Sequence, residues 1–360
     1  MLEAVLLDNY VIMSTSVKRV LLTGIGGFVG SHFMDHLLVN TDWHIVGVAS
    51  WRHKGIPERV YESIHYKKNK DRVTMVTHDL VSPFSQFTKE KIGKIDFIIN
   101  VASESHVDRS ITDPVGFIKN NVDLVLNILE YAREAKPKVF IQISTDEVFG
   151  SAPEDVDFGE WSTILPSNPY AASKAAQEAI AIAYWRTYQV PLIITNTMNN
   201  FGERQDKEKF IPLVIRKVVK GEKVTIHSYP DKKRAGSRFY LHARNHADGV
   251  LFLINKLVLK GKGPAKFGNG VDRPDRFNIV GEKEVDNLSM AQFIAKVLGR
   301  KLIYELVDFH TSRPGHDTRY SLDGSKIAKM GWKPPFSFEQ SLKKTIKWYL
   351  IGNNKRWLGL

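Results

Sequence analysis

A glycine-rich turn between the first apolar run and the first helix restricts the fold more than any other feature of the sequence. Residues 17–23, with the apolar run at 20–22, predict a buried strand, and residues 28–39 predict a helix. Between them Gly24, Gly27 and Gly30 recur at three-residue spacing. Glycines allow a tight strand-to-helix turn and a close approach of the backbone to a phosphate at the helix N-terminus. The turn therefore predicts a binding site for a dinucleotide pyrophosphate.

Apolar runs alternate with helical segments through the first half of the chain. Further strands are predicted at residues 44–49, 72–77, 95–101, 138–144 and 191–196. Long helices are predicted at residues 113–136 and 169–188. Apolar runs separated by helices are typical of a parallel sheet covered on both faces. The predicted fold class is α/β, with a doubly wound parallel sheet of the Rossmann type.

The rhythm of strands and helices loosens after residue 200. We predict an NAD(P)-binding domain at residues 17–200 and a smaller, mixed, mainly substrate-binding domain at residues 201–360, from which some segments return to the first. Residues 1–16 are predicted to be an N-terminal extension. Helices of the second domain are expected near residues 211–220, 243–257 and 289–298.

Composition narrows the class of protein. The chain has 360 residues and no cysteine, which excludes disulfides, thiolate zinc sites and cysteine nucleophiles, and we expect no metal site. Its net charge is +12, but the basic residues are scattered and no aromatic residues alternate with them, so no nucleic-acid partner is expected. No apolar run approaches the ~20 residues of a membrane span. A cytoplasmic protein without a membrane partner is the default expectation.

The residues after the second predicted strand bear on the choice of cofactor. An acidic residue at this position accepts hydrogen bonds from the adenosine ribose of NAD. Ala49 stands there instead, followed by Ser50 and the basic residues Arg52, His53 and Lys54, so no acid is expected to be available. The cofactor is expected to be NADP or NAD, with NADP slightly favoured because basic side chains suit a 2′-phosphate. The alternative is that these side chains only face water.

Tyr170 and Lys174 are four residues apart on one predicted helix, so their side chains share a face. We expect the nearby ammonium and the positive nicotinamide ring to lower the pKa of the phenol. The phenol could then take a proton from a hydroxyl while hydride leaves the same carbon.

Two adjacent carboxylates follow a hydroxyl at the end of the strand before that helix. Thr145 is suited to aligning a reacting hydroxyl, and Asp146 and Glu147 come next. The two acids could be solvated loop residues or a turn cap. Because carboxyl ends of strands line the ligand crevice in this architecture, a general acid and base pair is the favoured interpretation.

These motifs resemble the nucleoside-diphosphate-sugar 4,6-dehydratases of the extended short-chain dehydrogenase/reductase family. The resemblance runs from about residue 18 to residue 350 and includes the segments 102–110, 145–147, 168–170, 199–202, 208–212 and 313–317. Epimerases and decarboxylases on the same scaffold share the glycine turn and the Tyr/Lys pair but lack the Asp-Glu pair. That pair is therefore the specific signal.

The resemblance implies roles for the remaining candidates. Asp79 and Leu80 resemble the family's adenine-contacting pair, and Asn120 resembles its structural asparagine near the active site. The predicted dinucleotide contacts are Gly24, Gly27, Phe28, Val29, Gly30, Ser50, Arg52, Asp79, Leu80, Ala102, Ser103, Asn120, Tyr170 and Lys174. The predicted substrate contacts are Ser105, His106, Arg109, Asn199, Asn200, Lys209, Arg238, Arg313 and His316.

The resemblance also implies a reaction on a nucleotide sugar such as dTDP- or UDP-glucose. Tyr170 would take the C4 hydroxyl proton, Glu147 the C5 proton, and a neutral Asp146 would protonate the leaving C6 hydroxyl, giving a 4-keto-6-deoxy sugar. A homodimer is implied through the helices at residues 113–136 and 169–188.

Two alternatives stay open: a C4 epimerase or decarboxylase on the same scaffold, and a non-catalytic NADP-binding protein. Departures from the family pattern at Phe239, Tyr240 and Arg244 leave the nucleotide base and the sugar open.

Overall fold

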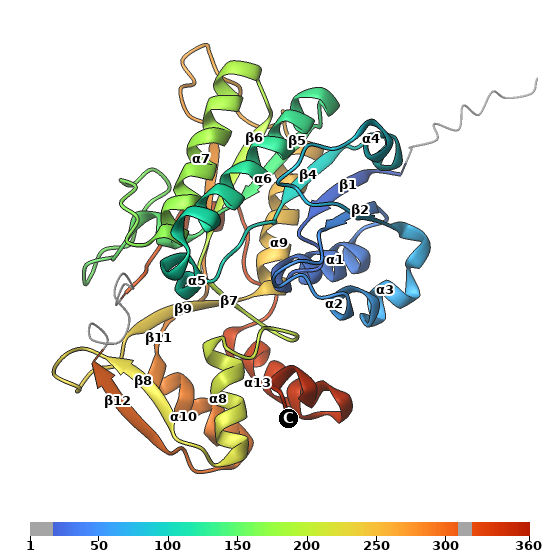
Figure 1. Ribbon diagram of the computed structural model, residues 1–360. Helices are drawn as coiled ribbons and strands as arrows, with labels where there is room; N and C mark the ends of the chain where they lie inside the picture. Colours follow the sequence, from blue (N-terminus) through green and yellow to red (C-terminus); the bar gives the residue numbers. More distant parts are fainter. Residues whose placement is uncertain (1–16, 309–318) are drawn as a thin grey trace, which may run out of the picture.

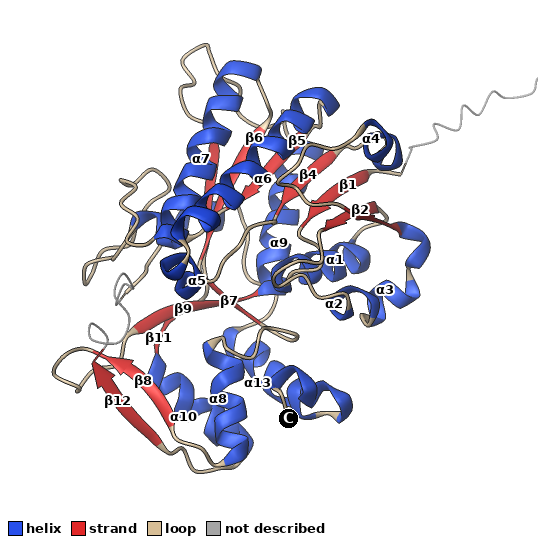
Figure 2. Cartoon of the chain, in the orientation of Figure 1, coloured by secondary structure: helices blue, strands red, loops and turns tan. Residues whose placement is uncertain are grey.

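The computed structural model describes residues 17–308 and 319–360 (Figure 1). The predicted N-terminal extension, residues 1–16, and the predicted substrate contacts Arg313 and His316 lie outside the described residues. Within the described ranges, a large sheet covered by helices lies above a smaller group of strands and helices (Figure 2).

Seven strands of the described chain form the large parallel sheet, in the order β10-β6-β5-β4-β1-β2-β3. Their bounds are β1 Arg19–Thr23, β2 His44–Ala49, β3 Val73–Thr77, β4 Phe97–Asn100, β5 Val139–Ile143, β6 Leu192–Thr197 and β10 Asp275–Ile279. The chain runs outward from β1 in one direction and then from β4 in the other. This confirms the doubly wound Rossmann-type sheet, whose switch point between β1 and β4 opens a crevice at the carboxyl ends of the strands.

Both faces of the sheet are buried. Side chains on a strand alternate between the two faces of the sheet, so neighbouring residues pack against different helices. Val20 and Leu22 pack toward α1 and α9, whereas Leu21 packs toward α6 and α7. The helices of this part are α1 Phe28–Asn40, α2 Glu58–Tyr61, α3 Ile64–Lys68, α4 Gln86–Ile92, α5 Val107–Thr112, α6 Pro114–Ala135, α7 Pro169–Tyr188, α9 Ala243–Leu253 and α12 Ser325–Lys329. A π-helix, Ile254–Leu259, directly continues α9.

The smaller part carries a mixed sheet and its own apolar core. Strands β7 Asn199–Phe201, β9 Ser237–His242 and β11 Glu284–Asp286 form one sheet, and β8 Val224–Ser228 pairs with β12 Tyr304–Asp308. Helices α8 Phe210–Lys220, α10 Asn287–Leu298 and α13 Phe338–Leu350 pack around them, and a 3₁₀ helix, Gly352–Leu358, follows α13. This part lies next to the carboxyl ends of the large sheet (Figure 1).

Strand β10 is the element of the large sheet that the sequence did not predict. It pairs in parallel with β6, although Asp275, Arg276 and Asn278 make its sequence polar. Arg276 is buried and pairs with the buried carboxylate of Glu178 on α7, so a charge lies where a core strand usually carries an apolar side chain. Among the described helices, none is long and apolar enough to span a membrane.

Candidate active site

One cavity of about 560 Å³ lies along the carboxyl ends of the large sheet and reaches the smaller part. Every predicted site residue within the described ranges lines it. These residues are Gly24, Gly27, Phe28, Val29, Gly30, Ser50, Arg52, Asp79, Leu80, Ala102, Ser103, Ser105, His106, Arg109, Asn120, Thr145, Asp146, Glu147, Tyr170, Lys174, Asn199, Asn200, Lys209 and Arg238. Segments far apart in the sequence thus meet at one place, and the role of each residue stays a prediction.

The glycine turn at one end of this cavity leaves no room for side chains. Gly24 has φ of +67°, and a Cβ there would lie 2.9 Å from the backbone nitrogen of Ala102. A Cβ on Gly30 would lie 2.1 Å from the carbonyl oxygen of Gly24. Helix α1 begins at Phe28 without a side-chain cap at Gly27, so its first N–H groups have no capping partner. This cradle fits the pyrophosphate of a dinucleotide.

The expectation that no acid is available near the end of β2 is wrong. Asp79, which follows β3, lies beside Arg52, and the two side chains form an ion pair. Ala49 at the end of β2 is paired with Thr77 at the end of β3, so the residues that follow the two strands converge. The sequence argument considered only the residues after the second strand, whereas the neighbouring strand supplies the carboxylate.

The rest of the basic loop after β2 also faces carboxylates rather than water alone. Glu104, after β4, and Glu208, before α8, each contact one residue of this loop and one predicted substrate residue. The contacts are His53 Nε2 to Glu104 Oε1 at 2.9 Å, Arg109 Nη1 to Glu104 Oε2 at 3.3 Å, His106 Nε2 to Glu208 Oε1 at 3.6 Å, and Lys54 to Glu208. Both glutamates lie in segments that carry the resemblance, but neither was assigned a role, because nothing in their own sequence neighbourhood indicates these partners.

Strand β5 delivers the hydroxyl and the two carboxyls. After the strand a 3₁₀ helix, Asp146–Phe149, begins, and the Thr145 side chain caps it by accepting a hydrogen bond from the Glu147 N–H at 3.4 Å. The Thr145 hydroxyl donates to Asp146 Oδ1 at 3.0 Å. The tight turn points consecutive residues in different directions, so Asp146 and Glu147 have different surroundings.

Those surroundings differ in burial and in hydrogen bonding. Asp146 is buried, and its Oδ2 has no hydrogen-bond partner within the described residues. Burial, followed by the negative charge of Glu147, raises the pKa of Asp146 to about 7. Glu147 is half-buried and accepts hydrogen bonds from Asn168 Nδ2 at 3.3 Å and from the Tyr320 hydroxyl at 3.4 Å. A buried carboxyl with a raised pKa therefore stands next to a carboxyl that accepts two hydrogen bonds.

Tyr170 lies in the first turn of α7. Asn168 caps this helix by accepting a hydrogen bond from the Ala171 N–H at 2.9 Å. Burial and then the negative charge of Glu147 raise the pKa of the Tyr170 phenol, and a hydrogen bond with Thr145 acts in the opposite direction. In the protein alone this tyrosine is accordingly protonated.

Lys174 does not act on Tyr170 as the sequence argument expected. Its ammonium donates to the carbonyl oxygen of Ile143 at 2.7 Å and to Gln177 Oε1 at 2.6 Å. Burial lowers its pKa to about 8. The lowering of the tyrosine pKa predicted from the spacing of the two residues is not observed, because both partners of the ammonium lie elsewhere.

The structural asparagine of α6 is Asn121 rather than Asn120. Asn121 is fully buried, accepts a hydrogen bond from the Glu104 N–H at 2.8 Å, and donates to the Glu104 carbonyl at 3.0 Å. It also donates to the Ser173 hydroxyl on α7 at 2.9 Å. Asn120 is half-buried at the cavity wall and donates only to Asn121 Oδ1, at 3.3 Å. The sequence placed this role one residue too early because two asparagines stand side by side.

The wall formed by the smaller part carries Arg238 and Asn200. Arg238 donates to the Ser237 carbonyl at 2.6 Å, and its guanidinium lies 4.8 Å from the centre of the Tyr320 ring. Asn200 donates to the Met198 carbonyl at 3.0 Å, while its Oδ1 has no partner within the described residues. Tyr320 was not predicted, because it lies beyond residues 313–317, the last segment that carried the resemblance.

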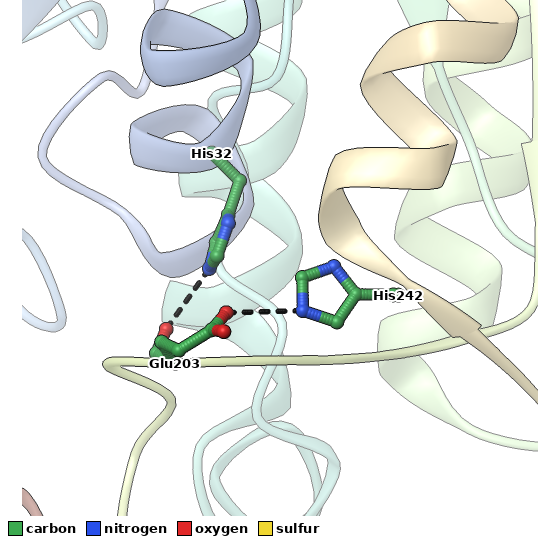
Figure 3. A group of neighbouring side chains, drawn as sticks. All are labelled: His32, Glu203 and His242. Carbon is green, nitrogen blue, oxygen red and sulfur yellow. Dashed lines mark hydrogen bonds and ion pairs between the residues drawn. The ribbon is translucent and has the colours of Figure 1, made fainter. Parts of the chain in front are cut away.

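A buried group of possible metal ligands, His32, Glu203 and His242, lies outside this cavity (Figure 3). His242 Nδ1 accepts a hydrogen bond from the Arg244 N–H at 3.0 Å, so the proton of the neutral ring is on Nε2, which lies 3.0 Å from Glu203 Oε2. His32 Nε2 lies 2.9 Å from the Glu203 carbonyl oxygen and must donate to it. Both Nε2 atoms that face the glutamate carry protons, so the group is a hydrogen-bonded link between α1 and β9 rather than a metal site.

A doubly wound dinucleotide fold whose glycine turn and Tyr/Lys pair line the same cavity defines a short-chain dehydrogenase/reductase of the extended type. Residues 21–345 match the model of the GDP-mannose 4,6 dehydratase family, and the chain belongs to this family.

Three similar proteins illustrate its relationships. The dTDP-glucose 4,6-dehydratase of Shigella flexneri is 32% identical over 360 residues, covering 93% of this chain and 94% of the relative. The crystal structure of DesIV, a dTDP-glucose 4,6-dehydratase from Streptomyces venezuelae with NAD bound, superposes with a TM-score of 0.79 at 30% identity, covering 94% of this chain and 98% of that one. A UDP-glucose 4-epimerase from Thermus thermophilus is 22% identical with a TM-score of 0.75, covers 91% and 98%, and shares the fold.

Replacing each of the two neighbouring asparagines in turn distinguishes their contributions to stability. Asn121→Ala removes the acceptor of the buried Glu104 N–H and a donor to both the Glu104 carbonyl and the Ser173 hydroxyl, and is expected to lower the free energy of unfolding by about 1–3 kcal/mol. Asn120→Ala should change it by less than about 0.5 kcal/mol. Urea denaturation of both variants measures the difference, and equal effects would contradict the assignment of the structural role to Asn121.

Proposed function

We propose that the chain is a nucleotide-sugar 4,6-dehydratase that converts a nucleoside-diphosphate hexose, dTDP- or UDP-glucose, to the 4-keto-6-deoxy sugar. The observation that carries the proposal is the pair of consecutive carboxyls beside Tyr170: Asp146 is buried with a raised pKa, and Glu147 accepts hydrogen bonds from Asn168 and Tyr320. Water can be removed across two carbons only if one group takes a proton and another gives one. Membership of the family and the names of the relatives support the same reaction.

The proposal assigns one proton transfer to each of Tyr170, Glu147 and Asp146. Tyr170 takes the proton of the C4 hydroxyl, with Thr145 holding the reacting oxygen in place. The resulting ketone acidifies the C5–H bond, and the carboxylate of Glu147 takes that proton. Neutral Asp146 protonates the C6 hydroxyl, so that water leaves and a C5–C6 double bond remains. Hydride addition at C6 is then balanced by a proton that C5 takes up from solvent. A bound nicotinamide dinucleotide supplies a hydride acceptor for C4, a hydride donor for C6 and a positive charge that favours the tyrosine phenolate.

Arg238 and Asn200 are proposed to bind the diphosphate, since guanidinium forks suit phosphate oxygens and the Asn200 amide has an unused acceptor. Ser105, His106, Arg109, Asn199 and Lys209 line the same cavity and complete the proposed substrate contacts. We also propose a homodimer formed through the outer faces of α6 and α7, where Val122, Leu126 and Ile180 are only half-buried.

An epimerase or decarboxylase is the second candidate, because the epimerase fold is shared. Neither reaction removes water, so neither needs a proton donor at C6. A protonated, buried Asp146 with an unpartnered oxygen therefore favours dehydration. A non-catalytic dinucleotide-binding protein would need none of these groups.

The reaction is tested with dTDP-, UDP-, CDP- and GDP-hexoses in deuterated water, followed by mass spectrometry. Wild type should yield a product lighter by one water, before counting solvent deuterium, with deuterium at C5. Glu147→Gln should still oxidise C4 but lose no water, Asp146→Asn should slow water loss, and Tyr170→Phe should slow oxidation, each by about two to four orders of magnitude.

Glu154→Gln is the matched control, since Glu154 is exposed and lies outside the cavity, and it should leave turnover unchanged. An isomer of unchanged formula, or carbon dioxide released from a uronate, would refute dehydration and favour the second candidate. If no sugar nucleotide binds or reacts, the non-catalytic alternative holds.

The pH dependence of dehydration should follow the protonation of Asp146. Because its pKa is raised to about 7, the proton needed for C6 is present below that pH and is lost above it. We therefore expect kcat/KM for dehydration to fall as the pH rises through about 7. In Asp146→Asn the remaining activity should lack this decline, which distinguishes Asp146 from Lys174, whose pKa is about 8. A wild-type profile that is flat through neutral pH would contradict this assignment.

The resident cofactor is proposed to be NAD. The reason for favouring NADP was the set of basic side chains after β2, but Arg52, His53 and Lys54 each contact a carboxylate. Asp79 beside Arg52 would also repel a 2′-phosphate. Acid extraction of the purified protein and chromatography of the released dinucleotide should recover NAD; recovery of NADP alone would restore the original preference.

A further inference from the structure

A second cavity, of about 630 Å³, lies at the opposite edge of the large sheet, where β5 and β6 begin. The ends of α6 and α7 form one side of it, and the loop after the π-helix forms the other. In Figure 1 this loop is drawn in orange near the end of α7 that lies farthest from the smaller part. Five cationic side chains line the cavity, which we call the basic groove: Arg133, Lys136, Lys138, Lys262 and Lys266.

The basic groove carries an uncompensated positive charge. No carboxylate is among its described lining residues. Two of the cations have acidic partners outside the groove: Arg133 with Glu130 at 3.6 Å and Lys138 with Asp96 at 2.9 Å. Lys136, Lys262 and Lys266 form no ion pair with any described residue. The sequence showed scattered basic residues, and the fold brings two distant basic segments together.

The loop that carries Lys262 and Lys266 is firmly anchored. The buried Trp185 donates its indole N–H to the Ala265 carbonyl at 2.7 Å, and the Ala265 N–H donates to Asp275 at 2.8 Å. A Cβ on Gly261 would lie 2.4 Å from the Leu257 carbonyl oxygen, so the turn out of the π-helix is closely packed. Irregular π-helical turns are frequent at binding sites. The lysines of the loop therefore face those of α6 and β5 across a preformed space.

The chemistry of the basic groove points to a small, multiply phosphorylated ligand. Clustered ammonium groups neutralise phosphates as point charges, whereas a single carboxylate would leave most of them unpaired. The volume falls within the roughly 300–1,000 Å³ typical of small-molecule pockets. A nucleic-acid site would instead need a stripe of charge with a series of stacking rings. Tyr188 at the rim is 46% exposed, and the Arg133 guanidinium lies 4.7 Å from the centre of its ring.

We propose that the basic groove is a binding site for a nucleoside di- or triphosphate, separate from the catalytic cavity. Its phosphates would lie among Lys136, Lys262 and Lys266, with the base toward Tyr188. The described lining residues include no carboxylate or histidine, so no general base is present and the site binds its ligand without transforming it.

The test titrates ATP into the full-length protein by isothermal calorimetry at physiological salt. Wild type should bind one ATP per chain. The double variant Lys136→Gln/Lys262→Gln should weaken ATP binding by about tenfold or more, because each substitution removes a charged partner. Lys67→Gln/Lys68→Gln is the matched control: it removes the same charge from exposed positions on α3, and should bind ATP as wild type does. Arg238→Ala, in the catalytic cavity, should also retain ATP binding, whatever the substrate of that cavity is.

Three results would overturn the proposal. Equal weakening in both lysine pairs would indicate attraction by net charge alone. Loss of ATP binding in Arg238→Ala would place the ATP in the catalytic cavity. Tighter binding of a DNA oligonucleotide than of ATP, dependent on Lys136 and Lys262, would identify a polymer site instead. Unchanged dehydratase turnover in Lys136→Gln/Lys262→Gln verifies that the variant is folded.

Discussion

A continuous chain of buried hydrogen bonds joins the glycine turn to the catalytic helix. The Thr23 hydroxyl, at the end of β1, donates to Asn100 on β4 at 2.6 Å, and Asn100 donates to Gln142 on β5 at 2.9 Å. Gln142 donates to Gln177 on α7 at 3.2 Å, and Gln177 Oε1 also accepts from Lys174. Such a network fixes the rotamer of every member, because an unpaired amide in the core would be costly.

The network explains the position of Lys174 better than a direct contact with Tyr170 does. Held by Ile143 and Gln177, the ammonium fixes the register of α7 against the end of β5. That register determines where Tyr170 stands relative to Thr145 and the two carboxyls. The same helix is tied to α6 through Asn121 and Ser173, so the wall of the cavity near Glu104 moves with it. Lys174 therefore acts first as a positioning residue within the protein.

The sequence predicted what repeats or has a fixed spacing. The glycine turn, the apolar strands and the pair of carboxyls after Thr145 are local patterns. These patterns were sufficient to predict the fold and to select residues that line one cavity. Strand β10 was not predicted, because its partner for the buried Arg276 is Glu178, 98 residues away in sequence. The acid near the end of β2 was missed for the same reason: the nearness of Asp79 to Arg52 follows from the pairing of β2 with β3 and from nothing in either segment alone. Contacts between side chains distant in sequence are set by topology, which local patterns do not encode.

The N-terminus of helix α7 supplies a positive potential near the Tyr170 phenol, whereas the Lys174 ammonium does not. Tyr170 is in the first turn of the helix, where the helix dipole favours a negative charge by about 0.3–1 kcal/mol. Burial and Glu147 act against the phenolate, so this contribution alone leaves the tyrosine protonated. The balance changes only when further positive charge enters the cavity. If Tyr170 is the base at C4, as proposed, the positive ring of a bound oxidised nicotinamide dinucleotide would favour its phenolate, which would couple the proton transfer at C4 to the presence of the hydride acceptor.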